Sequence, residues 1–434
     1  MSELVRCARA LVGGSERNDF AFVVRDGEIV DAGDFKPLRE RHPEAPTRAF
    51  PSDRLVVPGF VNGHSHAYQI LLRGWADDWS FERWRDEALY RVVPQLEPED
   101  VYWVFVAAFS EMLAAGITTV AEFFYLNGRG NAHAEAAIRA ASQTGIRLVL
   151  ARTWMDAPHA PEVFRESIAE ARERTRELRA AHPEANVCVA PHSLHGASEA
   201  MMRAAAAFAE EEDCDLHIHV AEAQSEAELS MSRFGKSPVL ALDSLGVLGA
   251  RTVAIHAIHV RDEEKALLAR RDVRVIHNPT TNLYLGDGIC DVVGLLERGI
   301  VMGLGTDANV KPSAIDEMRA ASHLQKLARL DGAALGASTA FDLATAQGAR
   351  ALGVSAGDLA AGNSADFLVL DASAIDPWSP PGNALVYRGE DCWVQAAFVR
   401  GARAYAGEPS LLSLEARRQC ARIALRCGVG KECV

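Results

Sequence analysis

Short apolar runs that alternate with longer stretches rich in Ala, Glu, Arg and Leu constrain the fold of this chain more than any other feature. Runs rich in β-branched residues are typical of strands, and their regular alternation with helical stretches indicates repeated β-α units. Eight such units favour a closed (β/α)8 barrel of the TIM type, an α/β fold, over an open sheet. The expected strands are residues 54–66, 117–125, 146–154, 185–194, 214–222, 251–259, 273–279 and 301–307.

The two ends of the chain have a different pattern. Residues 1–53 and 362–407 contain short alternating strands separated by Asp-Gly or Gly-X turns. We expect residues 1–57 and 362–407 to form one small β-sandwich domain beside a barrel of residues 58–361. Residues 408–434 form a C-terminal tail that is helical over 411–427.

Composition narrows the class of partner. The chain of 434 residues is 49% hydrophobic and 24% charged and carries a net charge of -14, as expected for a globular protein that repels phosphate backbones and anionic lipids. We therefore expect a small-molecule substrate, with no nucleic acid and no membrane as partner. The start of the chain lacks a secretory signal and no stretch is apolar enough to span a bilayer, which predicts a cytoplasmic protein. Its eight cysteines lack CxxC spacing and are expected to be reduced thiols.

The strongest local signal is the motif His64-Ser65-His66 at the end of the first expected strand. Residues i and i+2 of an extended chain point the same way, so both imidazoles can bind one ion. Other strand ends add His219 and Glu222, His256, and Asp307. Because the carboxyl ends of barrel strands share one face, these groups should line one mouth, as a nitrogen and oxygen set suited to zinc or iron.

This arrangement resembles the deaminase branch of the amidohydrolase superfamily. PGFVNGHSH is similar to the first-strand metal motif of that family, HVAE to its fifth strand, HNPTTNLYLGDG to its seventh and GLGTDA to its eighth. The resemblance implies that His64, His66, His219 and Asp307 bind the metal. The family members that hold two metals carry a carboxylated lysine on the fourth strand, where this chain has APHSLHG, so one divalent ion is expected, Zn rather than Fe. A homo-oligomer, a dimer, is also implied.

The same resemblance implies a hydrolytic mechanism. A bound cation acidifies its coordinated water and polarises the substrate. Asp307 is then expected to accept a proton, Glu222 to deliver one to the substrate nitrogen, and His256 to stabilise the oxygen that develops charge. Collapse of the tetrahedral centre releases ammonia.

Within this branch the chain resembles formimidoylglutamate deiminase, which hydrolyses the formimino group of N-formimino-L-glutamate. The resemblance implies substrate contacts by Gln69, Arg85, Tyr125 and His192. His195 stands where that family has an arginine, so a permanent charge for a substrate carboxylate is missing.

Two alternatives stay open. The first is deamination of an aminated heterocycle, such as guanine, 8-oxoguanine, cytosine, a triazine or an adenosyl compound, with Trp75, Trp79, Phe81 and Trp84 available for stacking. HNPTTN also resembles purine and adenosyl-type deaminases. The second is a metal-binding barrel without catalysis, which the complete set of chemical groups argues against.

Overall fold

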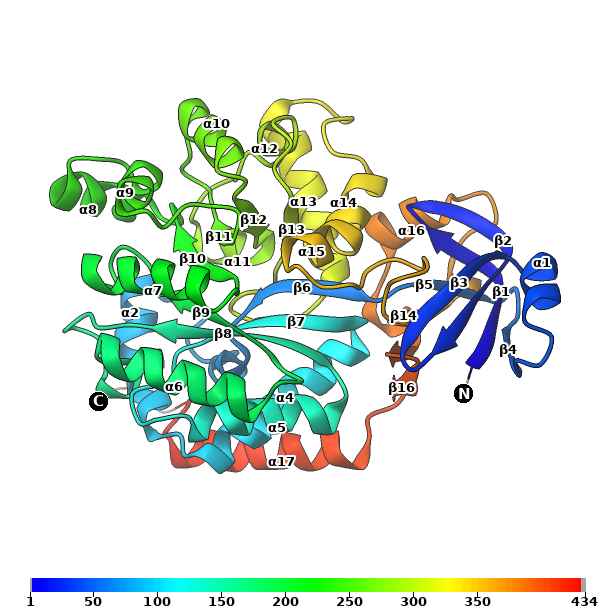
Figure 1. Ribbon diagram of the computed structural model, residues 1–434, viewed down its shortest axis with the longest axis horizontal. Helices are drawn as coiled ribbons and strands as arrows, with labels where there is room; N and C mark the ends of the chain where they lie inside the picture. The colour runs from blue at the N-terminus through cyan, green and yellow to red at the C-terminus, as the bar shows by residue number, and fades with distance from the viewer. Residues whose placement is uncertain (1, 431–434) are drawn as a thin grey trace.

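The computed structural model describes residues 2–430. Figure 1 shows two parts: a barrel surrounded by helices, and a smaller sheet at one end that contains both the start of the chain and strands from near its end. Among residues 2–430, no helix is both long and apolar enough to cross a membrane. The seven cysteines in this part of the chain are free, and Cys433 lies outside the described residues.

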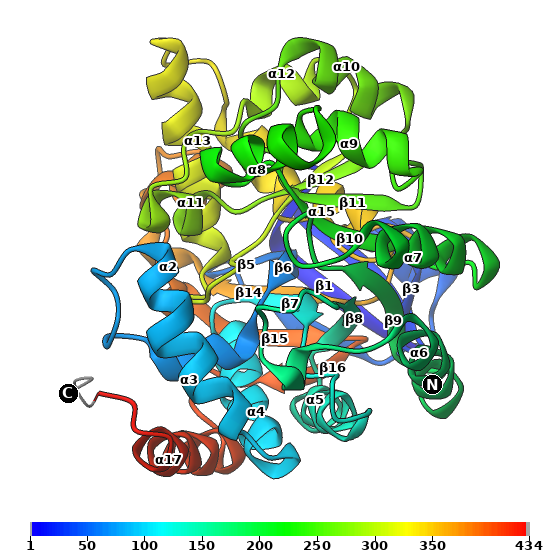
Figure 2. The same cartoon turned by 90° about the vertical axis from the view of Figure 1, so that its left-hand side faces the viewer.

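Eight parallel strands form the barrel sheet, which confirms the expected fold class. Figure 2 views the barrel from the side opposite the small sheet, with the helices arranged outside the strands. The strands are short and almost wholly buried, as expected when a parallel sheet is covered on both faces. They are β6 (Phe60–Ser65), β7 (Ile117–Phe124), β8 (Arg147–Trp154), β9 (Asn186–Pro191), β10 (Leu216–Val220), β11 (Thr252–His256), β12 (Arg274–His277) and β13 (Met302–Leu304).

The first expected strand, residues 54–66, is in fact two strands in two different sheets. β5 (Arg54–Pro58) pairs with the small sheet and β6 begins the barrel. The break falls at Gly59, where a Cβ atom would lie 2.1 Å from the Thr118 hydroxyl oxygen. A continuous apolar run did not reveal this break, because both strands are buried.

The small sheet is mixed and contains strands from both ends of the chain. Its order is β16-β15-β14-β5-β1-β2-β3, with β4 pairing with β1. Phe50 of β4 packs edge-on against Phe367 and Phe398, so the sheet folds over an apolar core of its own. The division of the chain into a terminal β-domain and a barrel stays a prediction. The strands are β1 (Ser2–Val12), β2 (Ser15–Arg25), β3 (Glu28–Asp34), β4 (Thr47–Phe50), β14 (Phe367–Asp371), β15 (Val394–Val399) and β16 (Ala402–Tyr405).

Helices cover the barrel between successive strands. α6 (Ile168–Ala181) follows β8, and the predicted helical tail is α17 (Leu411–Arg426). α17 runs along α4, as Figure 1 shows below the barrel. The outer helices are α4 (Pro98–Ala114), α5 (Ala132–Thr144), α7 (Glu199–Glu211), α8 (Gln224–Phe234), α9 (Pro238–Leu245), α10 (Asp262–Arg270), α12 (Val292–Leu296), α13 (Ala314–Arg329), α14 (Ala337–Leu343) and α15 (Ala346–Ala351).

Shorter helices lie over the open end of the barrel and beside the small sheet. The segment after β6 contains α2 (Phe81–Arg83), a π-helical turn at Trp84–Leu89 and α3 (Tyr90–Val92). α11 (Pro279–Leu285) follows β12, while α1 (Phe35–Arg41) and α16 (Pro381–Arg388) pack near the terminal sheet.

Candidate active site

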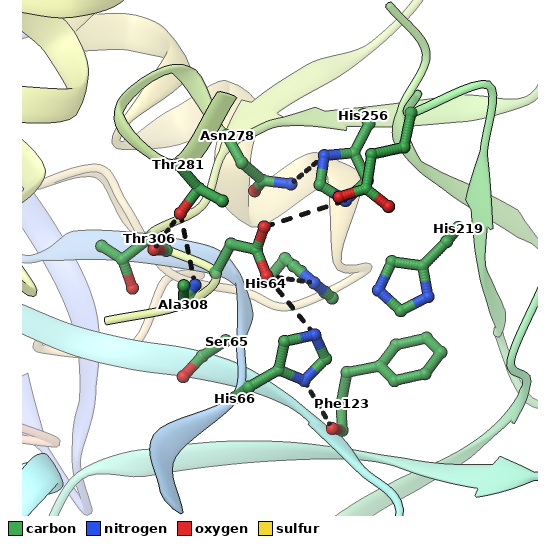
Figure 3. Close-up of polar contacts among 12 residues, drawn as sticks. His64, Ser65, His66, Phe123, His219, His256, Asn278, Thr281, Thr306 and Ala308 are labelled. Carbon is green, nitrogen blue, oxygen red and sulfur yellow. Dashed lines mark hydrogen bonds and ion pairs between the residues drawn. The ribbon is translucent and has the colours of Figure 1, made fainter. Parts of the chain in front are cut away.

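Four histidines converge at the carboxyl ends of the barrel strands (Figure 3). The ring of His64 lies 4.7 Å from that of His66, 5.0 Å from that of His219 and 5.9 Å from that of His256, between centroids. Asp307 comes from the end of β13, and its Oδ1 atom lies 3.3 Å from Nε2 of both His64 and His66. The fold thus brings together every residue expected to bind the metal.

Two overlapping groups of donor atoms could hold a cation. His64, His66 and His219 form one, and His64, His256 and Asp307 form the other; within each group the donor atoms lie within 4.8 Å of one another. All five side chains are buried. The barrel therefore contains a histidine-rich metal site, and geometry alone allows His256 to be a fifth donor.

The hydrogen bonds of the imidazoles show that this site fits a metal. Nδ1 of His66 lies 3.0 Å from the Phe123 carbonyl oxygen, and Nδ1 of His219 lies 2.9 Å from that of His192. A carbonyl oxygen only accepts, so each Nδ1 carries the proton and each Nε2 keeps a lone pair. Both ring nitrogens of His64 are buried without a hydrogen-bond partner. Nitrogen and carboxylate donors of this kind suit Zn²⁺.

Backbone hydrogen bonds fix the first strand of the barrel against the last. The His66 N–H donates to the Asp307 carbonyl at 2.9 Å, and the Asp307 N–H donates to that of His64 at 3.0 Å. The Asn309 amide donates both to the Ser65 hydroxyl at 2.9 Å and to the Asp307 carbonyl at 2.8 Å. The barrel closes here, so the side chains of His64, His66 and Asp307 are held in a fixed relative position.

Several residues at these strand ends have a backbone conformation that L residues seldom adopt. The φ angles are 52° at Ala221, 75° at His256, 49° at Ala257 and 50° at Asp307. Such angles cost free energy and are retained where surrounding structure enforces them. They make the chain turn sharply as it leaves β10, β11 and β13, in the neighbourhood of the histidine cluster.

Glu222 and His256 face each other beside the cluster, with Oε1 of Glu222 3.4 Å from Nε2 of His256. Burial, together with the charge of Asp307, raises the pKa of Glu222 well above its usual value, which favours its protonated form. Burial lowers the pKa of His256 to about 4, so its ring is neutral. A carboxyl group with a raised pKa and an imidazole with a lowered pKa therefore lie at one side of the cluster.

A cleft opens over the cluster and encloses about 990 Å³, including the space open to solvent at its mouth. All the residues expected to contact substrate line it: Gln69, Arg85, Tyr125, His192 and His195. Arg85 is partly neutralised, because its guanidinium pairs with Asp86 at 2.8 and 3.0 Å. Burial lowers the pKa of His195 to about 4, which makes it a neutral group in this wall.

The aromatic residues after the metal motif divide into two pairs. Phe81 and Trp84 line the cleft, with stacked rings 6.2 Å apart, whereas Trp75 and Trp79 do not line it. Only the first pair is therefore available to contact a substrate.

Sequence reasoning missed three features of the cleft. His159, on the loop after β8, lines it, and its position just beyond a strand end was the available signal. The Tyr284 hydroxyl donates to Asp77 at 3.0 Å, joining the segment after β6 to α11. The third feature is the contact of the Asn278 and Asn282 amides with His256. Both residues lie in the motif HNPTTNLYLGDG, but their contact with His256 forms only in the folded chain.

Comparison with known proteins places this site in a family. The model of the amidohydrolase family matches residues 55–404, which include the whole barrel. The chain belongs to the amidohydrolase family. The expected enzyme class, a hydrolase of carbon–nitrogen bonds in the deaminase branch, is confirmed.

This amidohydrolase is similar in sequence to named deaminases and in structure to a solved one. A 5'-deoxyadenosine deaminase from Methanothermobacter thermautotrophicus is 34% identical over 357 residues, 80% of this chain and 81% of its own length. A 5-methylthioadenosine/S-adenosylhomocysteine deaminase from Carboxydothermus hydrogenoformans is 32% identical over 358 residues, 81% and 80% of the two chains. The crystal structure of an adenosine deaminase from Xanthomonas campestris with bound zinc has a TM-score of 0.89 and 28% identity, and the match covers 97% of this chain and 98% of that one.

These relatives are named as deaminases of adenosyl compounds and not as formimidoylglutamate deiminases. The broader expectation, membership in the deaminase branch, is therefore confirmed, while the finer resemblance to the formimino enzyme receives no support from them. Of the two kinds of substrate that the sequence left open, the heterocycle has the better support.

Proposed function

We propose that this protein is a zinc-dependent hydrolase that removes the amino group of an adenosyl compound and releases ammonia. The observation that carries the proposal is the cleft that opens directly over the histidine cluster, with Glu222 and His256 on one side and the rings of Phe81 and Trp84 in its wall. Its aromatic lining suits the flat base of a nucleoside. The two named relatives supply the adenosyl class.

The proposed roles follow from position and protonation. His64, His66, His219 and Asp307 would hold the ion, which when bound acidifies a water molecule and polarises the substrate carbon. Asp307 is the nearest carboxylate to accept a proton from that water. Glu222, which holds a proton, delivers it to the ring nitrogen, and His256 donates a hydrogen bond to the oxygen that gains charge. Asp307 then passes its proton to the amino group, the C–N bond breaks to release ammonia, and the hydroxyl proton returns to Glu222 as the carbonyl group forms.

Ammonia release across a small panel of substrates tests the proposal. We expect kcat/KM of about 10⁴ M⁻¹s⁻¹ or more for 5'-deoxyadenosine, methylthioadenosine or S-adenosylhomocysteine. The kcat/KM values for guanine, cytosine and N-formimino-L-glutamate should be at least about 100-fold lower. A substrate of the wrong shape loses about 2.7 kcal/mol or more of transition-state binding, which corresponds to this factor. Fastest turnover of the formimino compound would overturn the adenosyl assignment and leave the reaction type intact.

A second candidate, hydrolysis of a formimino amino acid, rests on one wall of the cleft. Arg85, His159 and His195 all line it, and a guanidinium is a good partner for a substrate carboxylate. The same wall could instead receive the carboxylate of S-adenosylhomocysteine, a group that methylthioadenosine lacks. These two adenosyl compounds therefore form a matched pair for testing Arg85.

We expect Arg85→Met to raise KM for S-adenosylhomocysteine about tenfold and to change KM for methylthioadenosine less than about threefold, because only the first substrate loses a charge-assisted hydrogen bond. Asp86→Asn is the matched control. It frees the guanidinium from its present partner and should lower KM for the acidic substrate. Equal effects of Arg85→Met on both compounds would contradict a role in carboxylate binding.

A further inference from the structure

Two amide side chains contact the ring nitrogen of His256 that points away from the centre of the site. Nδ2 of Asn282 lies 3.1 Å, and Nδ2 of Asn278 3.2 Å, from Nδ1 of His256. Figure 3 shows the second of these contacts. All three side chains are buried.

Asp287 fixes which end of the Asn282 amide faces His256. Nδ2 of Asn282 lies 3.1 Å from Oδ2 of Asp287, as well as 3.1 Å from the imidazole. The pKa of Asp287 is raised by burial to about 6, so its carboxylate is ionised at neutral pH and only accepts hydrogen bonds. An amide turned the other way would set its oxygen against that carboxylate. The NH₂ group therefore gives one hydrogen to Asp287 and the other to His256.

The tautomer of His256 follows from this orientation. Nδ1 accepts a hydrogen bond from the amide, so the single hydrogen of the neutral ring must be on Nε2. His66 and His219 have the opposite arrangement, since their Nδ1 atoms face carbonyl oxygens. The neighbouring rings of His66, His219 and His256 are thus held in two different tautomers. The hydrogen-bond partner of Nδ1, a carbonyl oxygen or an amide NH₂ group, decides which tautomer each ring adopts.

We propose that Asn282, oriented by Asp287, is a positioning residue that keeps the hydrogen of His256 on Nε2. A nitrogen that carries a hydrogen has no lone pair for a metal, so His256 stays out of the coordination sphere although its distance from His64 and Asp307 would allow it to join. Instead its N–H points to the space beside Oε1 of Glu222, where a substrate would react. That His256 acts as a hydrogen-bond donor in catalysis rests on the proposed function; the assignment of its tautomer does not.

The tautomer can be observed without any substrate. In the zinc-loaded protein labelled with ¹⁵N-histidine, the His256 signals are identified by their loss in His256→Gln. We expect a pyridine-type Nδ1 and a pyrrole-type Nε2 for His256, and a pyrrole-type Nδ1 with a metal-bound Nε2 for His66 and His219. A pyrrole-type Nδ1 in His256 overturns the proposal, whatever reaction the enzyme catalyses.

A charge-neutral exchange tests the cause. In the double variant Asn282→Asp/Asp287→Asn the amide and the carboxylate trade places, so the group behind His256 becomes an acceptor and the hydrogen should move to Nδ1. We expect kcat to fall about 10²- to 10³-fold with KM changed less than about threefold, because the wrong tautomer removes catalysis without removing binding. The ¹⁵N signals of His256 should reverse.

Two single variants separate this role from packing. Asp287→Asn keeps the Asn282 donor and should cost less than about tenfold in kcat. Asn282→Ala leaves Asn278 as the remaining donor, so it should be less damaging than the double exchange. If Asn282 only fills space, Asn282→Ala should lower kcat more than the double exchange does, because a cavity is worse for packing than an isosteric carboxylate. That reversed order, or an unchanged ¹⁵N pattern in a folded double variant, overturns the proposal.

Discussion

Replacing Glu222 with Gln lowers kcat about 10²- to 10⁴-fold while the protein keeps its metal, which is the loss expected when a general acid is removed. Gln has the same shape and fills the same space beside His256, but it has no proton to deliver. Ammonia release measures the activity, and metal analysis of the purified variant measures the content of zinc. Loss of metal from Glu222→Gln would instead make this residue a ligand.

Glu226→Gln is a matched control for that experiment. Glu226 is also a buried carboxyl group, and it accepts a hydrogen bond from the Glu222 backbone N–H at 3.0 Å. A glutamine there still offers an oxygen to the same N–H. We expect a fall in kcat of less than about tenfold. An equal loss in both variants would mean that the effect at Glu222 is due to the shape of the loop rather than to proton transfer.

Removal of the metal should abolish turnover altogether and lower the melting temperature by several degrees, because an ion that binds only the folded state stabilises it. His219→Gln is expected to bind well below one equivalent of zinc and to lose activity in the same way. His217→Gln is its control, since His217 is buried on the same strand but belongs to neither group of donors.

Zinc content measured after dialysis decides between these outcomes. His217→Gln should retain about one equivalent, as expected for a mononuclear site. Full zinc content in His219→Gln would remove this residue from the ligand set. Activity that survives complete removal of the metal would contradict the proposed mechanism itself.

Much of the site could be predicted from the sequence because its chemistry is tied to strand ends. His64 and His66 lie two positions apart, with Ser65 between them, and this spacing places both side chains on one side of an extended chain. His219, His256 and Asp307 each follow an apolar run, so the barrel architecture brings them to the same face. These relations depend only on local periodicity and on strand order.

The protonation and charge of each group depended on burial and pairing in the folded chain. His195 reads as a group that could be charged, yet the loop that carries it is buried, and its pKa falls to about 4. Arg85 reads as a free cation, yet it pairs with its neighbour Asp86. Burial and pairing decide protonation and charge, and a sequence without coordinates specifies neither.

The sequence by itself determined the β-α repeat, the barrel and the residues that meet at its mouth, because strand periodicity and order follow from the local pattern of apolar residues. Only the tertiary structure decided where one apolar run divides at Gly59, which loop residues such as His159 reach the cleft, and which nitrogen of His256 carries the hydrogen. Those outcomes depend on packing and hydrogen bonds between segments far apart in the chain, and such contacts exist only once the barrel has closed.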